Sequence, residues 1–161
     1  MIAQLGLSNV WLKSGNLVKA RQEAGAFLES AVSTADPYLH ALAWELKSRI
    51  AIAELNWKQA DDYVHNGLAI LKEFDVPVAA WQIHATASDL YLHANDEQAA
   101  ETHRSLAQGY ILTIANSFLP EEPLREIFLA AGPVRRILAE KKQNWSTQSR
   151  KRKAAAPDGR P

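Results

Sequence analysis

Three short segments that begin with Asn and end with Ala recur along this chain at a nearly constant interval. They read NLVKA at 16–20, NWKQA at 56–60 and NDEQA at 95–99, so the second interval is shorter than the first by a single position. Repeats of this length are supersecondary units that cannot bury an apolar face alone, so they stack on one another. This periodicity constrains the fold more than any other feature of the chain.

Apolar residues around these segments follow the three-to-four-residue spacing of a helix face, and the alternation typical of strands is missing. The sequence therefore predicts an all-α fold. The expected apolar stripes consist of Ala20, Ala24, Phe27, Leu28 and Ala31; of Leu39, Leu42, Ala43, Leu46, Ile50 and Ala53; of Ala60, Val64, Leu68 and Leu71; of Val78, Trp81, Ala85 and Leu92; and of Ala99, His103, Leu106, Tyr110 and Ile114.

Helix ends are marked by turn chemistry at matching places. Asp36 can cap the first free N–H groups of a helix, and Pro37 suits the first helical position, where its missing N–H costs nothing. Pro77 occupies the equivalent place in the next unit. Gly15 suits the left-handed residue that ends a helix, and Asn16 follows it. Each unit is thus expected to be two helices joined by a tight turn.

The Ala that closes each segment has a physical purpose. Two helices joined by a short turn approach closely there, so Ala20, Ala60 and Ala99 are expected at the point of closest packing. Leu55 and Ala94 are expected to stand where the first unit has its turn glycine. The alternative is a four- or five-helix bundle whose turns resemble one another by chance.

This combination of turn, small residue and closing Pro resembles the tetratricopeptide repeat, in the long-helix variant of the C-terminal parts of large bacterial signalling ATPases, regulators and multidomain adenylate cyclases. The stretch IANSFLPEEPLREIFLAAGPVRRILAE at 114–140 resembles their closing segment. The resemblance implies a short right-handed α-solenoid of three antiparallel helix pairs closed by two short C-terminal helices. The expected domain covers 1–143, with units at about 1–36, 37–76 and 77–119 and closing helices within 122–143.

Charge divides the chain unevenly. Residues 1–140 carry 11 Lys or Arg and 17 Asp or Glu, whereas residues 141–161 carry 7 basic residues and one acidic residue. The terminal segment has few apolar side chains to offset its ordering entropy, so 144–161 is predicted to be a disordered basic tail that protease removes from about residue 146. The basic run at 150–153 is interpreted as solubilising, and phosphate contact is the alternative.

No catalytic chemistry emerges from the residue pattern, and the chain is predicted not to be an enzyme. Cysteine is absent, no glycine-rich phosphate loop occurs, and no Ser lies in a nucleophile elbow. The spacings of His84, His93 and His103 do not place them on one helix face, so neither a metal nor a cofactor is expected. The start of the chain does not resemble a secretory signal, and a cytoplasmic location is expected.

The predicted function is a non-catalytic protein-interaction scaffold, the C-terminal repeat part or a truncated form of a bacterial signalling or regulatory protein. The resemblance implies that a protein or peptide binds along the concave face formed by the first helix of each unit. The candidate partner-binding residues on that face are Asn9, Glu45, Arg49, His84 and Ser88. The alternatives are a nucleic-acid-associated regulator that uses the basic tail at 150–153, and a structural linker without a partner.

The first helix is predicted to be apolar on all sides and without an Asp-Pro opening. A repeat array exposes the packing face of its terminal unit unless that unit is capped. We therefore expect the chain to self-associate through residues 2–12, or to fray there. The apolar residues concerned are Ile2, Leu5, Leu7, Val10, Trp11 and Leu12.

Overall fold

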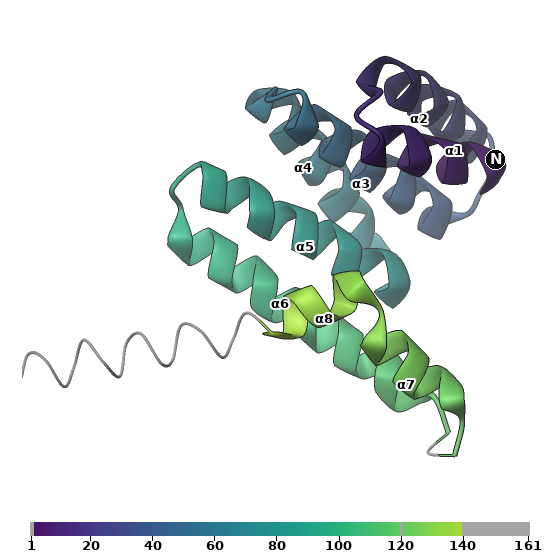
Figure 1. Ribbon diagram of the computed structural model, residues 1–161, viewed down its shortest axis with the longest axis vertical. Coiled ribbons are helices and arrows are strands. Elements are labelled where there is room, and N and C mark those ends of the chain that lie inside the picture. Colours follow the sequence, from purple (N-terminus) through teal and green to yellow (C-terminus); the bar gives the residue numbers. More distant parts are fainter. Residues whose placement is uncertain (1, 120, 140–161) are drawn as a thin grey trace, which may run out of the picture. The chain divides into compact units, whose positions relative to one another are not determined.

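The computed structural model describes residues 2–119 and 121–139, and every regular element within them is an α-helix (Figure 1). The all-α prediction is therefore confirmed for this part of the chain. No described helix is long and apolar enough to cross a membrane. The predicted tail, with the basic run at 150–153, lies outside the described residues. The helices are α1 (Ile2–Lys13), α2 (Leu17–Val32), α3 (Pro37–Ala53), α4 (Trp57–Glu73), α5 (Pro77–His93), α6 (Glu97–Ser117), α7 (Pro123–Ala130) and α8 (Gly132–Ala139).

The chain divides into two compact units, Met1–Ser117 and Phe118–Pro161, so the expected domain of 1–143 covers the first unit and part of the second. In the first unit α1 packs on α2, α3 on α4 and α5 on α6 (Figure 1). Successive pairs also contact each other, since α3 packs against α1 and α2, and α5 against α3 and α4. In the second unit α7 and α8 pack together. Both lie within the range expected for the closing helices.

The same tight turn joins the two helices of every pair in the first unit. In the first turn the Asn16 N–H donates to the Trp11 carbonyl at 2.9 Å, and the N–H of the preceding residue donates to the Leu12 carbonyl at 3.2 Å. The other two turns repeat both bonds at 2.9–3.1 Å, which is the Schellman arrangement with one left-handed residue. The left-handed residues are Gly15 (φ 77°), Leu55 (φ 59°) and Asn95 (φ 58°).

This geometry corrects the expected register of the third unit by one position. Asn95 is the counterpart of Gly15, not of Asn16, and Ala94 does not occupy the glycine position. The residue that caps α6 is Asp96, whose side chain accepts from the Ala99 N–H at 2.9 Å, as Asn16 and Asn56 accept at the starts of α2 and α4. The caps at 16, 56 and 96 are therefore evenly spaced. Asn suits a left-handed position as well as an N-cap, so the alignment of Asn95 with the caps Asn16 and Asn56 was wrong.

This shift of register also moves the packing face of α6. Ala100 is buried like Ala20 and Ala60, whereas Ala99 is only half-buried and Leu106 is exposed. On α5 the expected stripe was wrong at two of its four positions, because Val78 and Leu92 are exposed, whereas Ala85 is buried. The buried small and apolar residues of these helices are Ala79, Ala80, Ile83, Ala85, Ala87 and Leu90 on α5, and Ala100, Ala107, Ile111 and Ala115 on α6.

The left-handed conformation of Leu55 leads to a stability prediction. A side chain with a Cβ is strained at positive φ by about 1–2 kcal/mol, and Leu55 is exposed, so it gains little packing in return. We expect Leu55→Gly to raise the free energy of unfolding by up to about 1 kcal/mol, because glycine's greater unfolded-state entropy cancels part of the relief. Urea denaturation measures this. Leu55→Ala, which keeps the Cβ, is the control and should not stabilise.

Candidate functional site

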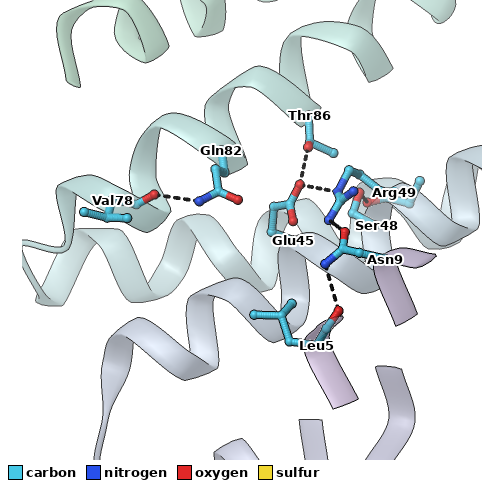
Figure 2. A network of polar contacts seen from close by, with 9 residues as sticks. Leu5, Asn9, Glu45, Ser48, Arg49, Val78, Gln82 and Thr86 are labelled. Carbon is cyan, nitrogen blue, oxygen red and sulfur yellow. Dashed lines mark hydrogen bonds and ion pairs between the residues drawn. The ribbon is translucent and has the colours of Figure 1, made fainter. Parts of the chain in front are cut away.

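Three of the five predicted partner-binding residues form one polar network that crosses α1, α3 and α5 (Figure 2). The Arg49 guanidinium donates to Asn9 Oδ1 at 2.8 Å and to Glu45 Oε1 at 2.7 Å. The Thr86 hydroxyl donates to the same Glu45 oxygen at 2.8 Å. A single ion pair therefore joins the first helices of three successive pairs.

Burial indicates that this network holds the helices together. Glu45 and Thr86 are buried, while Arg49 keeps about a third of its side chain exposed. A buried carboxylate is costly unless it is paired and hydrogen-bonded, and Arg49 with Thr86 meets that need for Glu45. Asn9 is fixed in turn, since its amide donates to the Leu5 carbonyl at 2.8 Å. The charges of Glu45 and Arg49 are thus balanced within the fold.

Ser88 belongs to a series of buried serines that recur once in each helix pair. Ser8 Oγ donates to the Ala20 carbonyl at 2.8 Å, and Ser48 Oγ donates to the Ala60 carbonyl at 3.0 Å, so each ties the two helices of a pair together. Ser88 is buried at the corresponding position of α5, and its Oγ has no hydrogen-bond partner within the described residues. The even spacing of the serines was available in the sequence and was missed.

His84 faces α6 and pairs with His103. The two Nδ1 atoms lie 2.8 Å apart, so one ring carries the proton there and the other accepts it. The rings of Tyr91 and Tyr110 lie against this pair. Burial, and then the neighbouring His103, lowers the pKa of His84 to about 4. Burial, followed by the charge of His65, also lowers the pKa of His103.

His84 lies on α5 and His103 on α6, so helical spacing within one segment did not predict their pairing. Two imidazoles alone do not make a metal site, and no group of three or more His, Cys, Asp or Glu side chains within the described residues could hold a metal ion. Both rings are neutral near pH 7, and nothing in the pair resembles a nucleophile with its base. The pair is an element of packing between α5 and α6.

The five predicted residues thus differ in how much surface they can offer. Glu45, His84 and Ser88 are buried, and Asn9 and Arg49 are half-buried within the network. Partner contact by these residues stays a prediction. Because of their internal hydrogen bonds, a partner could contact only the exposed edges of Asn9 and Arg49. The sequence shows that these five residues are polar and where they lie along each helix. Their burial depends on how successive helix pairs pack against one another, which the sequence of one helix does not give.

A different surface on α1 stands out by its exposure. Ile2, Leu7 and Val10 are exposed, and with Ala3 and Gly6 they follow one face of the helix; these five residues are called the α1 stripe. The six apolar residues expected to self-associate are therefore divided between two faces of α1. Leu5, Trp11 and Leu12 are partly buried and pack on the core formed with α2 and α3.

The repeat explains the α1 stripe. One repeat later its positions fall on α3, and four of the five are buried there by the preceding helix pair. They are buried because α3 packs against α1 and α2, whereas no described helix pair precedes α1. The α1 stripe therefore has the composition of a packing face, but it lies on the exposed face of α1. The buried counterparts are Leu42, Ala43, Leu46 and Ile50.

Two cavities of about 360 Å³ each lie in the first unit, between successive helix pairs. One lies among α2, α3 and α4 and is lined by charged and polar side chains, including Arg21, Lys47 and Glu54. The other lies between the start of α4 and the end of α5 and is lined mostly by aromatic and apolar residues, including Trp57. Both are lined in part by residues at the turn that joins the two helices of a pair.

No protein-family model, curated protein or solved structure matches this chain. The resemblance to the tetratricopeptide repeat accordingly stays a prediction from the residues.

Proposed function

We propose that this chain is a non-catalytic protein-interaction scaffold, built as a short right-handed α-solenoid of tetratricopeptide type from three antiparallel helix pairs and two closing helices. The even recurrence of turn, cap, buried Ala and buried Ser supports the stacked arrangement. So does the contact of α1 with α3 and of α3 with α5. The context of a bacterial signalling or regulatory protein, and the cytoplasmic location, stay predictions from the sequence.

The α1 stripe is the observation that carries this proposal. Contiguous apolar surface is uncommon on proteins that act alone and marks interaction sites. Residues 2–12 contain no charged side chain, and the exposed fractions of Ile2 and Val10 are 75% and 58%. Because the counterparts of the stripe on α3 are covered by a helix pair, the stripe fits a helix pair as its partner.

A second copy of this chain is the partner that we propose for the stripe. It carries the same exposed apolar stripe on its own α1, and it is present wherever the chain is present. Pairing of two stripes would give a closed dimer, whereas contact of one stripe with another surface would continue into longer assemblies. The size of the assembly distinguishes the two arrangements.

Sedimentation over a concentration series tests the proposal. We expect the mass of the parent chain to rise with concentration and Leu7→Glu to remain a monomer, because a charge in the stripe would be desolvated on association. Leu106→Glu is the matched control, since Leu106 on α6 is 44% exposed and Leu7 is 45% exposed. It should associate like the parent. A monomeric parent chain whose α1 amides are protected from exchange would contradict the proposal.

The charge imbalance of the sequence motivates a second candidate function, a nucleic-acid-associated regulator that uses the basic run at 150–153. Binding of this kind falls steeply with salt, since it depends on counterion release. Deleting residues 146–161 should abolish it and should leave association through the α1 stripe unchanged. Salt-insensitive association that survives the deletion favours the scaffold.

A further inference from the structure

The second cavity of the first unit combines aromatic walls with a carboxylate; we call it the Trp57 cavity. The indole of Trp57 stacks on the His93 imidazole, with 4.7 Å between ring centroids and 29° between the ring planes. Trp57 remains 38% exposed. The Tyr91 hydroxyl donates to Asp61 Oδ1 at 3.3 Å. The lining residues are Trp57, Asp61, Leu90, Tyr91, His93 and Ala94.

The electrostatic character of this cavity is negative. The pKa of Tyr91 is raised by burial, then by the charge of Asp61 and the hydrogen bond to it, and then by the charge of Asp96. Asp61 keeps 43% of its side chain exposed, so its carboxylate is accessible from solvent. His65 also lies close to Asp61: its Nδ1–H donates to the Asp61 backbone carbonyl at 2.9 Å and lies 3.5 Å from the carboxylate.

The first cavity is the counterpart of the Trp57 cavity one repeat earlier. In the aligned repeats Arg21 corresponds to Asp61, and Glu54 corresponds to Ala94. The Arg21 guanidinium donates to Glu54 Oε1 through Nε at 3.0 Å and through Nη2 at 2.5 Å. The fold therefore places an organic cation at this position between the first two helix pairs.

The same cavity also shows a cation over an aromatic ring. Its Lys47 ammonium lies 4.8 Å from the ring centroid of Tyr63. In the Trp57 cavity both charges of the Arg21–Glu54 pair are changed, because Asp61 stands at the position of Arg21 and Ala94 at the position of Glu54. The later cavity thus combines an accessible carboxylate with more aromatic surface, and none of its lining residues is Arg or Lys.

We propose that the Trp57 cavity binds the guanidinium of an arginine side chain from a partner peptide or protein. Asp61 would accept charge-assisted hydrogen bonds from the planar guanidinium, and the Trp57 and Tyr91 rings would provide faces for it to stack on. An ammonium ion fits less well, because it cannot lie flat on the indole while donating two parallel bonds. This site is separate from the α1 stripe, so the proposal does not depend on self-association.

A pair of peptides tests the proposal with the Leu7→Glu chain, whose altered stripe is remote from the cavity. One labelled peptide carries a single central arginine between Gly and Ser residues; in its twin, neutral citrulline replaces that arginine. We expect the arginine peptide to shift the indole N–H resonance of Trp57 and the citrulline peptide to leave it unchanged. Fluorescence polarisation of the label supplies the affinity.

Neighbouring acidic residues provide the matched variants. Asp61→Asn should weaken binding of the arginine peptide about five- to tenfold, the effect of losing a charge-assisted bond at a half-exposed site. Asp62→Asn, which changes an exposed carboxylate outside the cavity, should leave the affinity within about twofold, the effect of a distant screened charge. Trp57→Leu, at an exposed first helical position, should abolish the indole signal and weaken binding.

Three results would overturn the proposal: equal binding of the arginine and citrulline peptides, equal weakening by Asp61→Asn and Asp62→Asn, or binding without any change at the Trp57 indole. The second result would mean that the net negative charge of residues 1–140 attracts cations without a specific site. A parent chain that self-associates through α1 but does not bind the arginine peptide would contradict only the proposal for the Trp57 cavity. The scaffold proposal would not be affected.

Discussion

Replacing Ala60 with Leu should lower the free energy of unfolding by about 1–3 kcal/mol, the usual cost of forcing extra methylene groups into a packed interior. Ala60 is fully buried at the start of α4, and its carbonyl accepts the hydrogen bond of Ser48 from α3. A larger side chain would push the two helices apart at the point where that bond holds them. Urea denaturation measures the change. A variant as stable as the parent would mean that the helices do not meet closely at Ala60.

The third unit supplies a sharper form of this experiment, because two adjacent alanines compete for the corresponding position. Ala100 is buried and follows the Asp96 cap by the same interval as Ala60 follows Asn56, whereas Ala99 is half-buried. We expect Ala100→Leu to destabilise like Ala60→Leu and Ala99→Leu to cost less than about 1 kcal/mol. The opposite order of stabilities would restore the register in which Asn95 is the cap.

The limits of the sequence are visible in that same pair of residues. Helix existence, the turns and the first two small positions followed from local rules, because Gly15 and Pro37 each have one favoured role and Gly15 leaves Asn16 the role of N-cap. Asn95 has two favoured roles, as a left-handed residue and as an N-cap, and its neighbour Asp96 can cap as well. Only the backbone conformation decides between them. One ambiguous Asn therefore displaced the expected packing face of the whole helix α6.

The candidate site was less predictable, since its residues meet across helix pairs. Glu45 and Arg49 are one turn apart on α3, so their ion pair is a local feature that helical spacing allows. The bonds to Asn9 and Thr86 depend on how α1 and α5 lie beside α3. That relation is not encoded in any one helix. Alignment of the repeats places Asn9 and Arg49 at the same position, which is the signal that could have predicted their contact.

The pairing of His84 with His103 leads to the second large prediction, a loss of stability in acid. Burial lowers the pKa of His84 from 6.5 to about 4, and the pKa of His103 is lowered as well. The unfolded chain therefore binds protons at higher pH than the folded chain does, so the free energy of unfolding falls as pH decreases through 6.5 and toward 4. A shift of this size corresponds to about 3 kcal/mol from His84 alone, and this contribution is fully present above about pH 6.5.

A double variant separates this contribution from the acids that also titrate in the range. His84→Phe combined with His103→Phe keeps two rings against Tyr91 and Tyr110 and removes both imidazoles together, so no half of the hydrogen bond is left unpaired. Urea midpoints at about pH 7 and about pH 4.5 should differ less for this variant than for the parent. The exposed His93 provides the control, since His93→Phe should leave the parent's acid loss in place. If the double variant lost as much stability in acid as the parent, the proton that destabilises the fold would bind elsewhere, and the His84–His103 pair would have to accept a charge without cost.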